Sequence, residues 1–117
     1  MKEKITIRMP KRKLAKWLKA LRSGEYKQGE GALRNRNRFC CLGVMEHCLT
    51  GAIKRSHKGT QPLRWLAEQR ITFLSSHGHL DDVPYLPTLN TGATDANDDG
   101  TSFAEIADAI EACAEGY

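Results

Sequence analysis

The strongest constraint on the fold lies near the end of the chain, in the segment SFAEIADAIEACAEG. Ser102, with Glu105 three residues later, has the pattern of a helix-capping box. A helix with one apolar stripe gains most of its stability by burying that stripe against other elements. This segment must therefore pack on the rest of the chain. Its stripe consists of Phe103, Ile106, Ala107, Ile110, Cys113 and Ala114.

A second amphipathic segment, KRKLAKWLKALRSG, lies near the beginning of the chain. Leu14, Trp17, Leu18 and Leu21 fall on one helical face, and Lys and Arg occupy the other positions. Pro10 suits the start of a helix, and Gly24 stands where a helix C-terminus ends in the left-handed conformation. We therefore predict a helix from about residue 11 to residue 23.

Shorter patterns predict the remaining elements. CCLGVMEHCLTG reads as a second helix that ends at Gly51, and QPLRWLAEQR as a short third helix with Leu63, Leu66 and Trp65 facing inward. Residues 5–10 and 71–76 have the composition of strands, whereas residues 78–100 are rich in loop residues. We predict a compact α+β fold for residues 1–117, a single domain of three to four helices with a small two- to three-stranded sheet.

The composition points to a cytoplasmic location. No apolar run approaches the roughly 20 residues of a membrane span, and the first residues lack the apolar core of a secretory signal. In a reducing compartment the four cysteines are expected to remain free thiols. These are Cys40, Cys41, Cys48 and Cys113.

Charge is distributed unevenly along the chain. Residues 1–58 hold 16 Lys and Arg against 4 Asp and Glu, whereas residues 59–117 hold 2 against 10. Two interpretations remain open. Either the two halves pack so that opposite charges neighbour one another, or the chain presents a basic surface to an anionic partner and an acidic surface to a basic one.

The segment HGHLDD has the residue types of a metal site. It is similar to the His-x-His-x-Asp-His phrase of metallo-β-lactamase-type hydrolases, and it offers His77, His79 and Asp81 as ligands. However, Asp82 stands where those hydrolases have a histidine, and no histidine follows His79. We therefore expect neither a resident metal nor a cofactor, and keep these three residues as an alternative weak metal site.

One arrangement would be compatible with covalent catalysis. Cys40 precedes a predicted helix, where the helix dipole lowers the pKa of a thiol. Papain-like hydrolases order an oxyanion-hole Gln, a helix-start Cys, a His and an Asn or Asp along the chain, as Gln28, Cys40, His79 and Asp98 are ordered here. Cys40 would attack an acyl carbon with His79 as the base, oriented by Asp98 or Asp81.

The basic residues give an alternative based on binding. Four of them begin the first predicted helix, and three alternate in RNRNR, where an extended segment would place all three arginines on one side. Guanidinium groups suit phosphate recognition, so sequence-independent nucleic-acid binding is one function to consider. The candidate partner-binding or phosphate-binding residues are Lys11, Arg12, Lys13, Lys16, Arg34, Arg36 and Arg38.

Two distant motifs resemble a group of small uncharacterised proteins encoded by bacteriophages and prophages. WLKALRSGEYKQ followed by FCCLGV matches the first part of that group, and NDDGTSFAEIADAI matches its end. The resemblance covers about half of the chain and leaves out the HGHLDD segment. It implies a phage-like origin and a location in the host cytoplasm, and it implies no mechanism.

Together these observations favour binding over catalysis. We expect a small phage-type binding protein that inhibits or modulates a host macromolecule, as an anti-defence or host-takeover factor does. Its partner would be a host protein or a nucleoprotein complex, with nucleic acid contacted through phosphates. The alternatives are a cysteine-nucleophile hydrolase or transferase centred on Cys40, and a non-specific nucleic-acid binder that uses the basic half of the chain.

Overall fold

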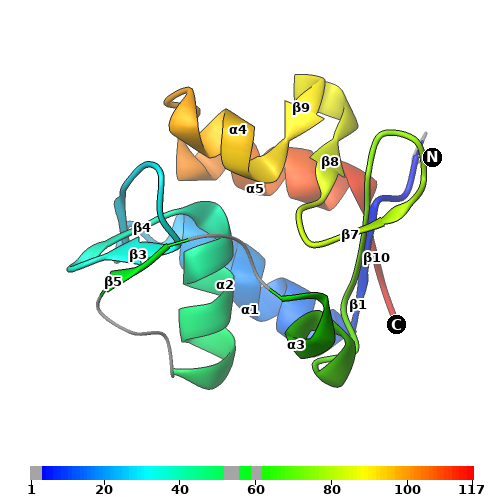
Figure 1. The fold of residues 1–117 in the computed structure, drawn as a ribbon, viewed down its shortest axis with the longest axis horizontal. Coiled ribbons are helices and arrows are strands. Elements are labelled where there is room, and N and C mark those ends of the chain that lie inside the picture. Colours follow the sequence, from blue (N-terminus) through cyan, green and yellow to red (C-terminus); the bar gives the residue numbers. More distant parts are fainter. Residues whose placement is uncertain (1–3, 52–55, 59–61) are drawn as a thin grey trace.

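Two amphipathic helices that lie at opposite ends of the sequence pack together in the middle of the molecule. The computed structural model describes residues 4–51, 56–58 and 62–117 (Figure 1). Helix α1 (Lys11–Arg22) buries Trp17, Leu18 and Leu21, and α5 (Phe103–Cys113) lies against it. Ser102 caps α5 as predicted, since its side-chain oxygen accepts a hydrogen bond from the backbone N–H of Glu105. The apolar stripe of each helix thus fills the same core.

Helix α2 (Cys41–Thr50) packs on α1. The indole Nε1 of Trp17 donates a hydrogen bond to the carbonyl oxygen of Cys41 at 3.0 Å, which satisfies the polar atom of a fully buried side chain. The helix ends as predicted at Gly51, which adopts a left-handed φ of 69°. The first half of α2 is therefore fixed inside the core.

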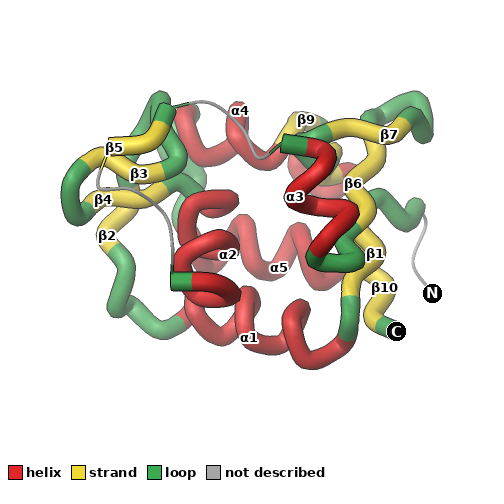
Figure 2. The backbone as a smooth tube through the Cα atoms, turned by 60° about the horizontal axis from the view of Figure 1, so that its bottom comes forward, coloured by secondary structure: helices red, strands yellow, loops and turns green. Residues whose placement is uncertain are grey.

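The strands form small sheets at opposite ends of this helical body (Figure 2). One, which we call the terminal sheet, has the order β10–β1–β6–β7, with β1 parallel to β10 and the other pairs antiparallel. Its strands are β1 (Ile7–Met9), β6 (Thr72–Leu74), β7 (Leu80–Asp81) and β10 (Ala114–Gly116). A separate two-stranded ribbon pairs β8 (Tyr85–Leu86) with β9 (Thr91–Gly92).

The four-stranded sheet at the other end carries Lys27, Arg34 and Arg38 and is called the basic sheet below. Its order is β2–β4–β3–β5, and only the pair β2–β4 is parallel. Its strands are β2 (Lys27–Gln28), β3 (Arg34–Asn35), β4 (Arg38–Phe39) and β5 (Ser56–His57). Each has only two residues, so the sheet depends on its attachment to the helices rather than on an extended ladder.

The fold class is confirmed as α+β, with more elements than the sequence patterns predict. The loop-rich stretch 78–100 contains the short helix α4 (Ala93–Asp98), the 3₁₀ helix η1 (Pro87–Leu89) and three of the short strands. In α3 (Leu63–Glu68), Leu66 is buried as predicted, but the expectation for Leu63 is wrong, because its side chain is 44 % exposed. Within the described ranges, no helix combines the length and the apolar character that a membrane crossing requires.

Opposite charges from the two halves of the chain meet where α1 lies beside α5. The guanidinium of Arg22 contacts Asp108 at 2.7 Å and Glu111 at 2.9 Å, and Arg8 lies 3.6 Å from Glu115 on neighbouring strands. Each of these side chains is substantially exposed, so the pairs contribute little to stability individually. They nevertheless place part of the acidic half against part of the basic half, as the first of the two charge interpretations expects.

One close approach fixes the basic sheet to α2. Gly43 lies so near the carbonyl group of Leu33 that a Cβ on Gly43 would stand 1.8 Å from that oxygen. The same oxygen accepts a hydrogen bond from the backbone N–H of Cys40 at 3.1 Å. Only glycine leaves room for this contact between the start of a helix and the loop before β3.

We predict that Gly43→Ala destabilises the protein, although alanine is the better helix former. At an unhindered helical position the change would gain about 1 kcal/mol, whereas overpacking at Leu33 costs roughly 1–3 kcal/mol. Gly92→Ala is the matched control, because its added Cβ would meet Val83 at an ordinary 3.6 Å. Chemical denaturation of both variants measures the difference; a Gly43→Ala protein as stable as wild type would contradict the contact.

Candidate functional site

The strand register sorts the side chains of the basic sheet into two rows. Lys27 pairs with Arg38, Arg38 with Asn35, and Asn35 with Ser56, so these residues form one row across all four strands. Neighbouring strands lie about 4.8 Å apart, which gives the row a length of about 14 Å. All four residues are exposed. We call the row formed by Lys27, Arg38, Asn35 and Ser56 the outer row.

The opposite face of the sheet packs on the protein. Phe39 is buried in this face, and the guanidinium of Arg34 covers its ring at 4.9 Å from the centroid. Tyr26 packs edge-on against Phe39, with 5.1 Å between ring centroids, and the Tyr26 hydroxyl lies 2.8 Å from Nδ1 of His47. Burial raises the pKa of Tyr26. The aromatic groups on this side are thus occupied in holding the sheet to α2.

The expectation that the three arginines of RNRNR share one side is wrong. The segment is a hairpin, in which Arg36 and Asn37 form a two-residue turn between β3 and β4. Arg34 therefore pairs with the buried Phe39, whereas Arg38 pairs with Asn35 in the outer row. Arg36 lies exposed at the tip with a φ of 59°, a left-handed conformation that costs a non-glycine residue about 1–2 kcal/mol.

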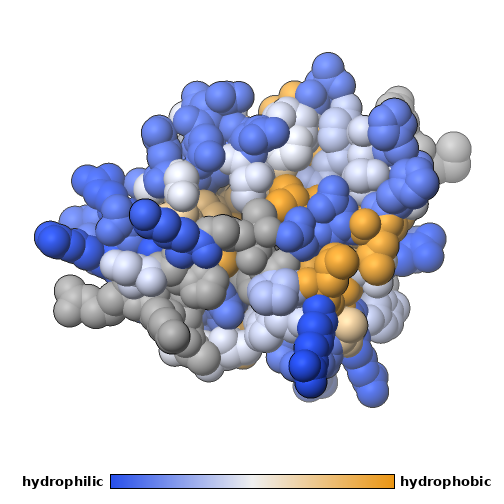
Figure 3. Space-filling view, viewed as in Figure 1, coloured by the Kyte–Doolittle hydropathy of each residue, from blue (hydrophilic) through white to orange (hydrophobic). Residues whose placement is uncertain are grey.

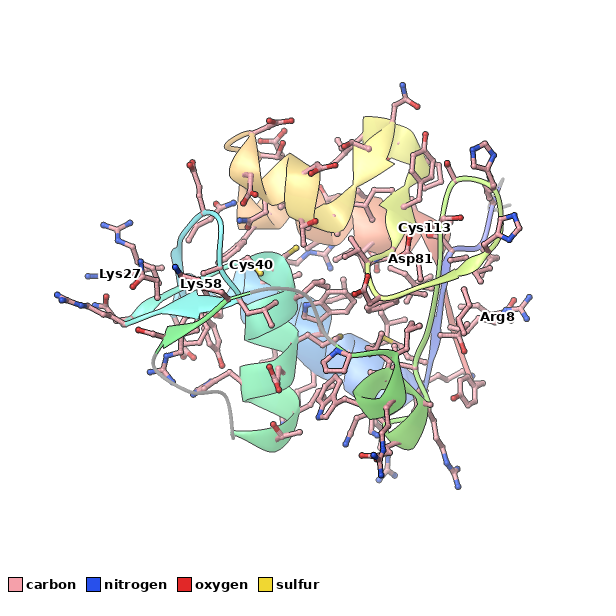
Figure 4. The ribbon with its side chains drawn as sticks, viewed as in Figure 1. Arg8, Lys27, Cys40, Lys58, Asp81 and Cys113 are labelled. Atoms are coloured by element: carbon pink, nitrogen blue, oxygen red, sulfur yellow. The ribbon has the colours of Figure 1, made fainter. Side chains whose placement is uncertain are left out.

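The cations of the outer face have no acidic partner within the described part of the chain. Lys27 and Arg38 occupy neighbouring register positions, and Arg36 stands at the adjacent tip, yet none of the three forms an ion pair with a described Asp or Glu. The guanidinium of Arg38 donates instead to the carbonyl oxygen of Gln28 at 3.3 Å. Figure 4 shows Lys27 extending from the sheet away from the helices. Like charges placed side by side repel each other, and an anion bound between them would relieve this repulsion.

The basic residues at the start of α1 form a separate group. Lys11, Arg12 and Lys16 are exposed there, beside the terminal sheet and at the other end of α1 from the basic sheet (Figure 2). Lys13 is half-buried, and its ammonium group donates to the backbone and side-chain oxygens of Gln69 at 2.8 and 3.0 Å. The seven candidate cations thus divide into two groups, one at the start of α1 and one in the basic sheet. Of these two groups, the one in the basic sheet has cations aligned by strand pairing.

Two of the residues proposed for cysteine catalysis, Gln28 and Asp98, take part in a network of hydrogen bonds that joins loops to helices. The side-chain amide of Gln28 donates to Asn97 Oδ1 at 3.1 Å and to the carbonyl oxygen of Thr101 at 2.6 Å. Asn97, which is fully buried, donates to the carbonyl oxygen of Gly29 at 2.7 Å. Asp98 accepts from the backbone N–H of Gly31 at 2.9 Å. The loop after β2 is thereby bonded to α4 and to the residues that precede α5.

Cys40 does not have the environment of a nucleophile. Its side chain is 3 % exposed and accepts a hydrogen bond from the backbone N–H of Gly43 as the N-cap of α2. Burial raises the pKa of Cys40, so the lowering expected from the helix dipole is wrong: removal of the thiolate from water outweighs the backbone hydrogen bonds. His79 lies in the turn between β6 and β7 of the terminal sheet, whereas Cys40 follows β4 of the basic sheet, and these two sheets lie at opposite ends of the helical body (Figure 2). Gln28, Cys40 and Asp98 are brought near one another without the proposed base.

The turn that carries HGHLDD provides no assembled metal site. His77 and His79 are exposed, and their backbone N–H groups donate to Oγ of Ser75. Asp81 is half-buried and accepts from the backbone N–H of Asp82 at 2.7 Å. Across the described residues, no three His, Cys, Asp or Glu side chains lie close enough together to hold an ion.

An apolar groove of about 450 Å³ lies between α3 and the strands β6 and β7. The exposed large hydrophobic residues of the described chain all line it: Leu63, Leu80 and Tyr117. Figure 3 shows the corresponding apolar area on this face. Besides its apolar side chains, the groove is lined by Arg70, Thr72 and Asp81.

The sequence patterns missed part of the outer row. Lys27 joins it through the parallel pairing of β2 with β4, and Ser56 joins it through β5. Neither residue belongs to the alternating RNRNR segment, and two-residue strands leave no periodicity from which such pairing could be predicted. The structure also describes all four cysteines and pairs none of them in a disulfide, in agreement with the expected free thiols.

Residues 9–59 match the model of a domain of unknown function (DUF8296). The matched segment runs from the end of β1 to just beyond β5, and so includes α1, α2 and every strand of the basic sheet. It ends before α3 and the HGHLDD turn. No curated protein and no solved structure matches the chain.

We predict that Cys40 reacts slowly with iodoacetamide at neutral pH in the folded protein. Its burial limits access, and its raised pKa keeps the thiol protonated. Because the thiolate is the reacting form, labelling at Cys40 should be slower than that of a free thiol peptide and should reach the peptide's rate in denaturant. Mass spectrometry of the labelled peptides measures this, and faster labelling of Cys40 than of the free peptide would restore the catalytic interpretation.

Proposed function

We propose that this chain is a non-catalytic binding protein that modulates a macromolecule of a bacterial host by docking the outer face of its basic sheet on an anionic surface. The observation that carries the proposal is the alignment of Lys27 and Arg38 in the outer row, with Arg36 at the adjacent hairpin tip. These three side chains are exposed and are not neutralised by any described carboxylate. An anionic partner would remove the unfavourable proximity of these like charges.

The conformation of Arg36 supports a role in binding. Glycine would occupy the same left-handed position without steric cost, whereas arginine is strained there. The main-chain carbonyl of Arg36 accepts from Nε of Arg34 at 2.7 Å, but that contact does not require a guanidinium at position 36. A long cationic side chain at this tip therefore adds little to the fold and much to a basic surface.

The geometry around the alternative nucleophile supports binding over catalysis. Cys40 is buried with a raised pKa, and His79 lies in the terminal sheet's turn between β6 and β7. The side chains of Gln28 and Asp98 form hydrogen bonds with backbone groups of neighbouring loops. A cysteine hydrolase would need an accessible thiol with a base in reach.

The class of partner in this proposal comes from the sequence resemblance to phage and prophage proteins. A small protein of such origin acts in the host cytoplasm, where an anti-defence or host-takeover factor meets a host protein or a nucleoprotein complex. The matched domain of residues 9–59 contains the whole basic sheet, which makes this face a property of the domain rather than of the C-terminal segment.

We predict that tagged protein captures a defined partner from bacterial lysate and that neutralising the basic sheet abolishes the capture. The test variant is Lys27→Gln with Arg38→Gln, and the matched control is Lys11→Gln with Lys16→Gln, which removes two exposed cations from the start of α1. Capture by the control and loss of capture by the test variant support the proposal. Equal capture by both variants, or loss only in the control, would contradict it.

A further inference from the structure

We infer that the anionic surface recognised by the basic sheet is the phosphodiester backbone of double-stranded nucleic acid. This inference rests on the proposed function, because it names the partner chemistry of the same outer face. The site consists of the cations Lys27, Arg36 and Arg38, with Asn35, Asn37 and Ser56 as neutral hydrogen-bonding groups between and beside them.

The composition of the face favours phosphates over an acidic protein. The centre of a protein–protein interface is usually a desolvated cluster with aromatic or aliphatic anchors. The outer row contains no apolar side chain, and the nearest aromatic ring, Phe39, is on the buried face. Interfaces with nucleic acid are more polar and much more positively charged, and most of their hydrogen bonds go to phosphate and sugar. The outer row has that composition.

The position of the aromatic residues also favours a duplex over a single strand. Proteins that bind single strands stack bases on exposed aromatic rings along a basic groove. Here Phe39 is covered by Arg34, and Tyr26 is half-buried and engaged with His47. The outer face therefore offers charge and hydrogen bonds without a stacking surface, which suits a backbone whose bases remain paired.

The shape of the hairpin fits the same partner. The ribbon β3–β4 ends in Arg36 and Asn37 at one edge of the molecule (Figure 1). Because β2 and β5 flank this hairpin, the four-stranded sheet would lie along the backbone of the duplex, where its outer face and the hairpin tip can meet phosphates. Arg36 at the turn and Arg38 two residues later would contact different phosphates, while Lys27 extends the row along the backbone.

Several contacts anchor the sheet to the helical body. Gln28 and Asn97 bond the loop after β2 to the helical body, and Gly43 lies against the carbonyl of Leu33. The cationic side chains are therefore presented from a fixed backbone. Contacts to phosphate alone do not distinguish one base sequence from another. The affinity should therefore depend on the salt concentration and not on the DNA sequence.

The test is fluorescence anisotropy with a labelled DNA duplex of mixed sequence, about two helical turns long. Three neutralised phosphates predict a log–log slope of affinity against salt of about −2.7. In Arg36→Gly, binding should weaken and the slope should become shallower by about 0.9. The melting temperature of this variant should equal or exceed that of wild type, because glycine accommodates the φ of 59°.

Arg70→Gly is the matched control, since Arg70 is also exposed and has a φ of 63° but lies at the end of α3, away from the basic sheet. It should relieve strain in the same way and leave duplex binding unchanged. Equal weakening in both variants, salt-independent binding, or tighter binding to the single strand of the same sequence would overturn the inference.

A nuclease-treated capture experiment separates this inference from the proposed function. If no duplex binding is measured, but a nuclease-resistant protein is captured by wild type and lost in Lys27→Gln with Arg38→Gln, the nucleic-acid assignment fails and the binding function stands. If neither DNA nor protein depends on those two cations, both fail.

Discussion

The arrangement of the molecule depends on the buried side chain of Asn97. Its amide accepts from Gln28 and donates to the carbonyl of Gly29, so that one fully buried group joins α4 to the last residue of β2 and to the first residue of the loop that follows. A buried amide left without partners would cost about 1–3 kcal/mol for each polar group, which makes any rearrangement of this loop expensive. The two-residue strands of the basic sheet are too short to define their own orientation. Asn97 and Gln28 define it for them.

This role explains why several polar residues of the kinds that hydrolases use cluster at this point of the fold. Amide and carboxylate side chains at Gln28, Asn97 and Asp98 satisfy backbone groups of loops that would otherwise be buried without partners. Cys40 caps α2, and glycine at position 43 allows the helix start to approach Leu33. The same residue types serve hydrolases in the order seen here, but in this fold their polar atoms are directed at the protein's own backbone. The exposed cations Lys27 and Arg38 lie on the outer face of the same sheet.

Sequence patterns were sufficient for the parts of the fold that bury an apolar stripe. The helices that contain Trp17 and Ile106 follow from periodicity, and their ends follow from Gly24 and Ser102. The short helix ATDAND has no such stripe and was not predicted within the loop-rich stretch. Strand β10 directly follows α5, and no turn residue between them marks the change from helix to strand. The end of the predicted apolar stripe, Ala114, is accordingly a strand residue. These short elements form because of their tertiary contacts, which local propensity does not predict.

The candidate site divides in the same way. The segment RNRNR identified a basic part of the chain. Because it contains a two-residue turn, Arg34 and Arg38 lie on opposite faces of the sheet instead of one. Lys27 lies beside Arg38 through strand pairing, which the sequence pattern does not reveal. A titration of ¹⁵N-labelled protein with a short DNA duplex, followed by amide chemical shifts, tests the assignment of the binding face most directly. The largest shifts should fall on Lys27 and on residues 35–38, with little change at residues 11–16 and 77–82. Shifts concentrated at the start of α1 or around the HGHLDD turn, with the basic sheet unaffected, would contradict it.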